Sequence, residues 1–355
     1  MLFTLYLYAL NFPFASIAAT SSAVVLSSLQ ATFTRPEWVI LVRSATAGAG
    51  RAFHGVAGAP FLMENSSPKE RMHLFAISSA VGSAATFVGS LAAGFLPAYV
   101  LCPVRPESIR MALVLSIPVS LVSLVPIGMM KEPKPEGIKD LLGNAVSPRL
   151  IAKLVLAASL FAFAAGFSYA FFPLLYGHHH QSSHEQVGLY MGLASLAAAG
   201  AILVSPAASR RFGKVNATVV LSMVSVPFLF IMAFSGSVLV VVAAMVARAV
   251  AINSAYPVRS VFSMEVLQQK ERGTGEGAMH MASDLTMGLA ALAAGSLIGA
   301  TGGFEVPFAF AAIVMIAAAA LYFVLFRDFA EGRRGTDRSA TRVGAEPTSD
   351  ARPTD

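Results

Sequence analysis

Three ionisable side chains, Glu276, His280 and Asp284, recur every four positions in the last third of the sequence. Residues four apart lie on the same face of an α-helix, so this spacing predicts one polar stripe. Burial favours the neutral, protonated form of a carboxyl group, and histidine titrates near neutral pH. Asp284 is therefore a candidate proton carrier, with His280, one turn away, as its relay. The structural alternative is that Asp284 pairs with an arginine.

Arginines inside apolar stretches form a second set of candidates. Arg51 and His54 are three residues apart and share a helical face, with Arg43 before them. Arg248 stands eleven residues before Arg259, which is close to three helical turns. A planar guanidinium holds a carboxylate or phosphate through two hydrogen bonds, so these arginines could bind an anionic group. The structural alternative is that they cap backbone carbonyls or anchor a helix at an interface.

A histidine-rich stretch, GHHHQSSHE at 177–185, offers a third pattern. Histidine nitrogens and a carboxylate are ligands of zinc, copper and nickel. The weak candidate ligands are His178, His179, His180 and His184. Consecutive histidines in a loop let at most two neighbours share one ion easily, so we favour a solvated loop. The sequence predicts no metal site and no cofactor.

The chain that carries these residues is strongly apolar. Its 355 residues are 56% hydrophobic and 12% charged, with a mean hydropathy of +0.68, whereas soluble domains carry about 25% charged residues. Its apolar segments are long enough to cross a hydrocarbon core of about 30 Å as helices. The sequence therefore predicts an all-α polytopic membrane protein. An ionisable residue inside such a helix is costly unless it faces water or a partner, which makes it a candidate functional residue.

Hydropathy divides the chain into ten expected transmembrane helices. Their approximate bounds are 4–31, 38–62, 73–100, 109–130, 150–176, 187–208, 216–235, 238–262, 275–300 and 305–326. The polar stretch 131–149 is a central loop that separates a four-span N-terminal half, 1–130, from a six-span C-terminal half, 150–327. The tail 328–355 is too polar to bury a core, and we expect it to be disordered.

Basic residues orient these helices. Of the 25 lysines and arginines, Arg35, Arg105 and Arg110 fall in one set of connections, whereas most fall in the alternate set and in the tail. Cytoplasmic loops carry such an excess, so we expect a multi-pass protein of the plasma membrane with both termini in the cytoplasm. The net charge of +6 then reflects this orientation and contact with anionic lipid. The sequence contains no nucleic-acid-binding motif.

One polar motif occurs twice. MENSSPKER at 63–71 and MEVLQQKER at 264–272 are 201 residues apart, and the same shift aligns SLAAGFL, from Ser90, with ALAAGSL, from Ala291. One shift that aligns a helix end, a loop and the next helix indicates two homologous halves in parallel orientation. Fewer spans precede the first motif than the second, so two helices are missing from the front. Either the true start lies upstream of Met1 or the protein is a ten-helix form.

With its two helical halves, basic central loop and loop motifs, the chain resembles the major facilitator superfamily of transporters over residues 1–327. SPKER at 67–71 is similar to the family's loop after the fourth helix of a half, and RSATAGAG at 43–50 to that fourth helix. PAASRRFGK at 206–214 is similar to its signature loop, with Pro206 and Arg210 in place of the usual Gly and Asp. The conformational residues that this resemblance implies are Lys69, Glu70, Arg71, Arg211, Gly213, Lys214, Lys270, Glu271 and Arg272.

The resemblance also implies a mechanism, in which substrate binds between the halves and the halves rock so that the cavity opens to alternate sides. The second and eighth spans correspond to the family's cavity-lining fourth helices. The implied substrate contacts are Arg43, Arg51, His54, Arg248, Asn253, Tyr256 and Tyr169, and the implied coupling residues are Asp284 and His280. Pro257 is expected to kink the eighth span, and glycines such as Gly94 and Gly288 to let helices approach closely.

The sequence thus predicts a secondary active transporter of a small molecule, either an organic anion or a drug, with protons as the candidate coupling ion. The alternative is a non-transporting sensor or scaffold derived from the same fold. We predict no enzyme, because no nucleophile–base or paired-acid set converges in the sequence. No P-loop is present, which argues against ATP-driven transport by this chain alone. We expect a monomer that contacts membrane lipid and no nucleic acid.

Overall fold

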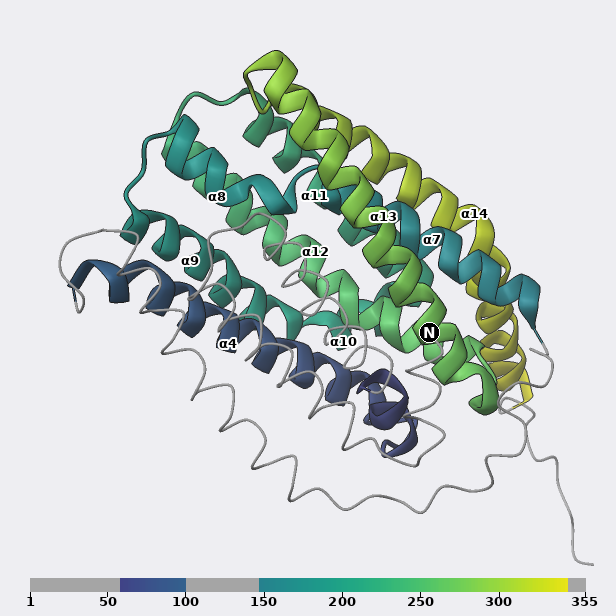
Figure 1. Cartoon of the computed structure of the whole chain (residues 1–355). Helices are drawn as coiled ribbons and strands as arrows, with labels where there is room; N and C mark the ends of the chain where they lie inside the picture. The colour runs from purple at the N-terminus through teal and green to yellow at the C-terminus, as the bar shows by residue number, and fades with distance from the viewer. Residues whose placement is uncertain (1–57, 100–146, 344–355) are drawn as a thin grey trace, which may run out of the picture.

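The computed structural model of the chain describes residues 58–99 and 147–343 (Figure 1). Every regular element in these two ranges is helical, which confirms the all-α prediction for them. The α-helices are α4 (Arg71–Tyr99), α7 (Pro148–Gly166), α8 (Phe172–Leu174), α9 (His184–Ile202), α10 (Ser205–Phe212), α11 (Lys214–Phe234), α12 (Val238–Val266), α13 (Arg272–Thr301) and α14 (Glu305–Val343). Short 3-10 turns at Tyr169–Phe171 and Gln269–Glu271 and a π-turn at Leu175–His179 connect them.

Six helices in the described ranges are long and apolar enough to cross a membrane. They are Arg71–Leu96, Pro148–Gly177, Lys214–Phe234, Val238–Val266, Gln269–Thr301 and Glu305–Phe329. Each overlaps one of the expected spans, with ends that differ by a few residues, because helix ends are less sharply marked in a sequence than apolar centres. The expected spans 4–31 and 109–130, and most of 38–62, lie outside the described residues.

The expected span 187–208 is a bent pair of helices. α9 and α10 pass the same test of length and hydropathy together, with an angle of 50° between them. Leu203 and Val204 form the break, and Pro206 stands in the first turn of α10. Proline has no N–H to continue the hydrogen-bond ladder of α9 but fits the first turn of a new helix, so the chain changes direction there.

The last helix, α14, ends later than the sequence predicts. α14 continues past its apolar stretch to Val343, so the segment predicted to be disordered from residue 328 begins as helix. Polarity excludes a buried core for these residues, but it does not exclude a helix, since Ala, Glu and Arg are good helix formers. The first part of the predicted tail is therefore a helical extension.

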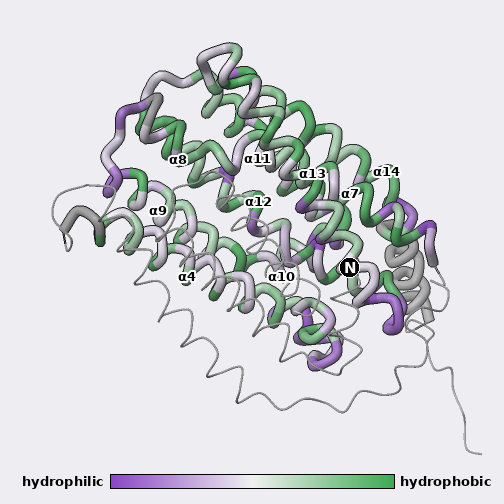
Figure 2. Tube along the Cα trace, in the orientation of Figure 1, coloured by the Kyte–Doolittle hydropathy of each residue, from purple (hydrophilic) through white to green (hydrophobic). Residues whose placement is uncertain are grey.

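Aromatic rings fill the core of the region from α7 to α14. Phe161 of α7, Phe262 of α12 and Tyr322 of α14 are buried, and the Tyr322 ring meets the other two at centroid distances of 6.0 and 5.9 Å, edge to face. Such pairs contribute about 0.5–1.5 kcal/mol each beyond the area they bury. In contrast, Leu285 and Leu292 of α13 are exposed on an apolar face, as expected of a helix that faces lipid. Figure 2 shows that hydrophilic segments gather at helix ends.

Glycines set the closest helix contacts. α7 and α13 meet at Gly166, where a Cβ would lie 2.5 Å from the carbonyl oxygen of Met287. α4 packs along α9, its neighbour in Figure 1, and a Cβ on Gly94 would lie 3.0 Å from the Cα of Gly188. Gly94 therefore allows the close approach expected of it, whereas a Cβ on Gly288 would meet no atom within 4 Å.

Four helices begin at the same end of the bundle, and each begins with basic residues. These residues are Arg71 of α4, Arg149 of α7, Lys214 of α11 and Arg272 of α13. We call this end the basic end. It corresponds to the side that the sequence predicts to be cytoplasmic.

Candidate functional site

Arg248 is a buried cation near the middle of α12. Arg248 is 5% exposed. It lies ten residues, or about 15 Å along the helix axis, from the start of α12. Its guanidinium carbon lies 5.4 Å from the centroid of the Phe172 ring, and Nη2 donates a hydrogen bond of 3.5 Å to Oγ of Ser168. Tyr169 interacts with it electrostatically. All three partners follow the end of α7 at Gly166, so the interruption of that helix creates the surroundings of Arg248.

No described carboxylate forms an ion pair with Arg248. Its Nε atom is buried and has no hydrogen-bond partner among the described residues. A buried charge without a counter-ion costs several kcal/mol, whereas one cation–π contact returns about 0.5–2 kcal/mol. The described surroundings therefore leave the guanidinium incompletely satisfied, with the N–H groups that a carboxylate or phosphate would accept from.

α12 carries two other predicted substrate contacts, Asn253 and Tyr256. One of them uses its side chain within the helix and the other is exposed. Asn253 uses its amide nitrogen for a hydrogen bond of 2.9 Å to the carbonyl oxygen of Ala249, one turn earlier on the same helix. Tyr256 is 48% exposed and can contact a ligand. α12 runs on through Pro257, whose missing N–H leaves the carbonyl of Asn253 without its helical donor.

The polar stripe on α13 divides into a buried pair and an exposed acid. Glu276 is 6% exposed, and its Oε1 lies 3.3 Å from Nε2 of His280. Oε2 of Glu276 is buried without a hydrogen-bond partner among the described residues. Asp284 is exposed. The sequence prediction that these residues share a face is confirmed for Glu276 and His280 by their contact.

Arg259 of α12, the preceding long helix in the chain, interacts with this stripe. Its guanidinium carbon lies 4.6 Å from the centroid of the Phe161 ring, and it interacts electrostatically with Glu276 and with Tyr256. Arg248 and Arg259 are thus both on α12, but they face different surroundings. Arg248 contacts an aromatic ring and a hydroxyl group, whereas Arg259 interacts electrostatically with the carboxylate of Glu276.

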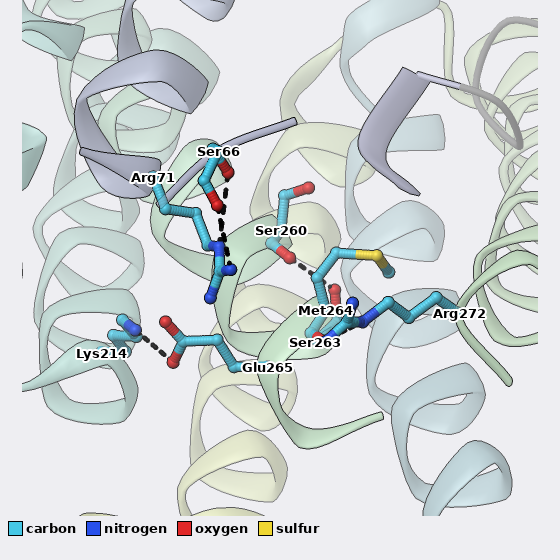
Figure 3. A network of polar contacts seen from close by, with 8 residues as sticks. All are labelled: Ser66, Arg71, Lys214, Ser260, Ser263, Met264, Glu265 and Arg272. Atoms are coloured by element: carbon cyan, nitrogen blue, oxygen red, sulfur yellow. Dashed lines mark hydrogen bonds and ion pairs between the residues drawn. The ribbon is translucent and has the colours of Figure 1, made fainter. Parts of the chain in front are cut away.

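A polar network lies at the basic end (Figure 3). Lys214 at the start of α11 forms an ion pair with Glu265 at the end of α12. Figure 3 shows the side chain of Arg71 extending from the α4 side toward Glu265. Arg272 donates a hydrogen bond of 2.9 Å from Nε to the carbonyl oxygen of Met264. It also interacts electrostatically with Arg71 and Glu265. This network gathers residues of both KER motifs at one place.

The glutamates of the two KER motifs have different partners. Glu70 accepts a hydrogen bond of 2.9 Å from the backbone N–H of Ser67, which caps the turn before α4. Hydrogen bonds from Ser67 lower the pKa of the Glu70 carboxyl, so this cap is present at neutral pH and is lost as pH falls through that lowered pKa. Glu271 is buried and accepts instead from the backbone N–H of Ser147, at 2.7 Å. It ties the start of α7 to the start of α13.

The remaining loop-motif residues lie on the surface of the basic end. Lys69, Lys270 and Arg211 are exposed, and the guanidinium of Arg211 lies 5.5 Å from the ring of Phe212. Gly213 joins α10 to α11 with φ +78°, a conformation that favours glycine. A side chain at this position would strain the turn between the two helices.

The other predicted site residues are less informative. His184 is exposed at the start of α9, and no cluster of three potential metal ligands occurs among the described residues. Leu175–His179 is a π-turn, not the loop expected for the histidine run. Of the remaining candidates, Arg43, Arg51 and His54 lie outside the described residues.

Comparison with known families decides the identity of the fold. The sequence model of the Major Facilitator Superfamily matches residues 12–238 and, in a second match, 154–352. The chain belongs to the Major Facilitator Superfamily. No curated protein sequence matches the chain. The resemblance stated from the loop motifs is therefore confirmed, and the chain has the fold of a multi-pass membrane transporter.

Solved structures of this superfamily share the fold. A bacterial homologue of the iron transporter ferroportin in an outward-facing state has a TM-score of 0.61 and 15% identity, over 90% of this chain and 84% of that one. The E. coli fucose:proton symporter has a TM-score of 0.60 and 16% identity, over 88% and 84%. The human organic anion transporter MFSD10 has a TM-score of 0.60 and 16% identity, over 87% and 76%. These neighbours carry different substrates, so their likeness concerns the fold alone.

Two residues of this superfamily member were not predicted as site residues, although the sequence contains a signal for each. Glu276 belongs to the four-residue stripe, but Asp284 was preferred because it lies further inside the expected span. Arg259 follows Arg248 by three turns. The residues that pack around each side chain decide between them, and a helical period alone does not identify those neighbours.

The ion pair at the basic end predicts an unequal effect of removing its two partners. Glu265→Gln is expected to lower the melting temperature more than Lys214→Gln, because the loss of Glu265 leaves Lys214, Arg272 and Arg71 without its negative charge. An exposed ion pair is worth up to about 1 kcal/mol, and this pair is partly buried. Thermal unfolding of both variants in detergent measures the difference. Molar salt should reduce it by screening, and equal melting temperatures at low salt would contradict the shared role of Glu265.

Proposed function

We propose that this protein is a secondary active transporter that carries a small organic anion by alternating access between two helical halves. The halves are residues 1–130 and 150–327, joined by the central loop 131–149. In this proposal the monomer spans the plasma membrane with the basic end and both termini in the cytoplasm. Protons drive the transport, and the substrate binds between the halves.

The observation that carries the proposal is the buried guanidinium of Arg248. It is 5% exposed, has an unpartnered Nε among the described residues and has no described carboxylate as a counter-ion. A substrate carboxylate or phosphate would supply the missing acceptor oxygens, at about 1.5–3 kcal/mol for a hydrogen bond to a charged group. Tyr169 and Tyr256, both exposed, supply aromatic surface and hydroxyls for the rest of the molecule. Arg43, Arg51 and His54 are the proposed contacts from the first half.

A hydrophobic drug is the second candidate substrate. The aromatic groups near Arg248, Phe172 and Tyr169, would suit an apolar ring as well as an anion. A drug without negative charge would leave Arg248 unsatisfied, which is why the anion is preferred. The remaining alternative is a sensor or scaffold that binds a ligand but does not move it.

Exchange in proteoliposomes tests the proposal. Vesicles that contain the purified full chain are loaded with an unlabelled probe and diluted into the same labelled probe. The probes are benzoate, fluorescein, glycerol 3-phosphate and the hydrophobic cation ethidium. We expect counterflow of at least one anionic probe and none in protein-free vesicles. Counterflow of ethidium alone would replace the anion by a drug, and binding without counterflow of any probe would support the sensor.

A further inference from the structure

Glu276 is a buried carboxylate with one oxygen in use and one without a partner. Its Oε1 contacts His280 at 3.3 Å, and its Oε2 is buried without a hydrogen-bond partner among the described residues. A fully ionised carboxylate normally fills both oxygens with donors when it is buried. A protonated carboxyl group needs fewer hydrogen-bond donors around it, because one of its oxygens carries a hydrogen. The geometry therefore suits a group that alternates between the two forms.

Charged and titratable groups surround this carboxylate on several helices. On α13 itself, His280 contacts Glu276 and interacts electrostatically with Asp284. From α12, Arg259 and Tyr256 interact with Glu276, and Tyr322 of α14 interacts with Arg259. Other titratable groups on the elements that α13 packs against are Arg149 and Lys153 of α7, Lys270 and Glu271 in the turn before α13, and Arg327 and Asp328 of α14.

Two cations therefore compete for one carboxylate. Arg259 is permanently charged, and it is held at Phe161 on α7. His280 is a cation only when its imidazole is protonated. When Glu276 is ionised, it balances Arg259 and accepts from His280. When it is protonated, its attraction for both is lost, and α12 and α13 lose an electrostatic link. Protonation of Glu276 thus changes the electrostatic interaction between residues of α12 and α13.

We propose that the carboxylate of Glu276, paired with His280 and set against Arg259, is the proton-binding site that couples the proton gradient to transport. This inference rests on the proposed function. In each cycle one aqueous proton binds Oε2 from one side of the membrane, which converts the carboxylate to a carboxylic acid. The same proton leaves to the other side, and the carboxylate is restored. Asp284, the carrier expected from the sequence, is exposed on the outer part of the stripe and contributes through His280 only.

The first readout is independent of transport. Infrared difference spectra of the purified full chain, recorded as pH is lowered, should contain the carbonyl band of a protonated carboxylic acid that is absent in Glu276→Gln and present in Asp284→Asn. If Glu276→Gln does not fold, His280→Gln replaces it. That variant keeps the band but changes the pH at which it appears. A band that survives in Glu276→Gln, or that is lost in Asp284→Asn alone, would overturn the assignment.

The second readout is transport of whichever anionic probe exchanges fastest among benzoate, fluorescein and glycerol 3-phosphate. Glu276→Gln is expected to lose accumulation driven by a pH gradient, at least tenfold, and to keep counterflow within about twofold of the wild type. Asp284→Asn is expected to keep both. Gradient-driven accumulation by Glu276→Gln at the wild-type rate would refute the coupling role. Absence of counterflow in the wild type, with the infrared assignment upheld, would refute the proposed function and leave the proton site in place.

Discussion

Replacing Arg248 with glutamine is expected to raise the KM for an anionic probe by about tenfold to a hundredfold. Glutamine keeps two polar atoms and most of the volume but removes the charge and the fork of donors. Hydrogen bonds to charged groups are worth about 1.5–3 kcal/mol, and each 1.4 kcal/mol is tenfold in affinity. The concentration dependence of counterflow in proteoliposomes measures the change.

Two further variants make this result specific. Arg248→Lys keeps the charge but loses the planar fork, so its KM should lie between those of the wild type and Arg248→Gln. Arg149→Gln removes an exposed arginine at the start of α7 and should leave KM unchanged. If Arg248→Gln also leaves KM unchanged while the protein folds and exchanges an anion, Arg248 does not bind the substrate. Its burial would then have to be explained by the helix contacts around it.

The burial of Arg248 shows why this site could be predicted in part from the sequence. A charged residue in the middle of an apolar segment is costly, and that cost identified Arg248 before any neighbour was known. The sequence did not identify Ser168 and Phe172 as those neighbours, because they lie in the interrupted region after α7. Ser168 and Arg248 are 80 residues apart in the sequence, so only the folded chain brings them into contact.

The KER repeat shows a different limit. The shift of 201 residues predicts two equivalent loops, and in the structure residues of both loops lie at the basic end. It did not predict that Glu70 caps its own loop whereas Glu271 holds the start of α7. The difference depends on Ser147, which approaches Glu271 from another part of the chain. A motif fixes the local turn, but the elements that surround it decide which hydrogen bond its carboxylate makes.

Asp284 and Glu276 show the same limit on one helix. The four-residue spacing placed both on one face, and depth in the expected span favoured Asp284. In the structure Glu276 is 6% exposed and Asp284 is exposed. Glu276 contacts His280 and interacts electrostatically with Arg259 and Tyr256 of α12. Helical periodicity gives the face of a residue but not the neighbour that covers each turn of that face.

Gly188→Leu is expected to reduce the maximal rate of counterflow at least tenfold with little change in KM. α4 and α9 belong to different halves in the proposed transporter, and their backbones meet at Gly188. A Cβ there would lie 2.7 Å from the carbonyl oxygen of Ser90 and 2.8 Å from the Cα of Gly94. Both atoms are backbone, so α4 itself must move. A leucine side chain holds the two helices apart at the end opposite the basic end, and the halves then cannot close there.

Gly200 provides the matched control because it lies on the same helix and a Cβ on it would meet nothing within 4 Å. Both substitutions remove a helical glycine, which favours the helix by about 1 kcal/mol in each case. Gly200→Leu should therefore leave the rate unchanged and raise the melting temperature slightly. The intermediate Gly188→Ala should lower the rate less than Gly188→Leu, in proportion to the volume forced between the helices. Equal rates for Gly188→Leu and Gly200→Leu would mean that transport does not require α4 and α9 to meet at this end, and the alternating-access proposal would then need a different closing contact.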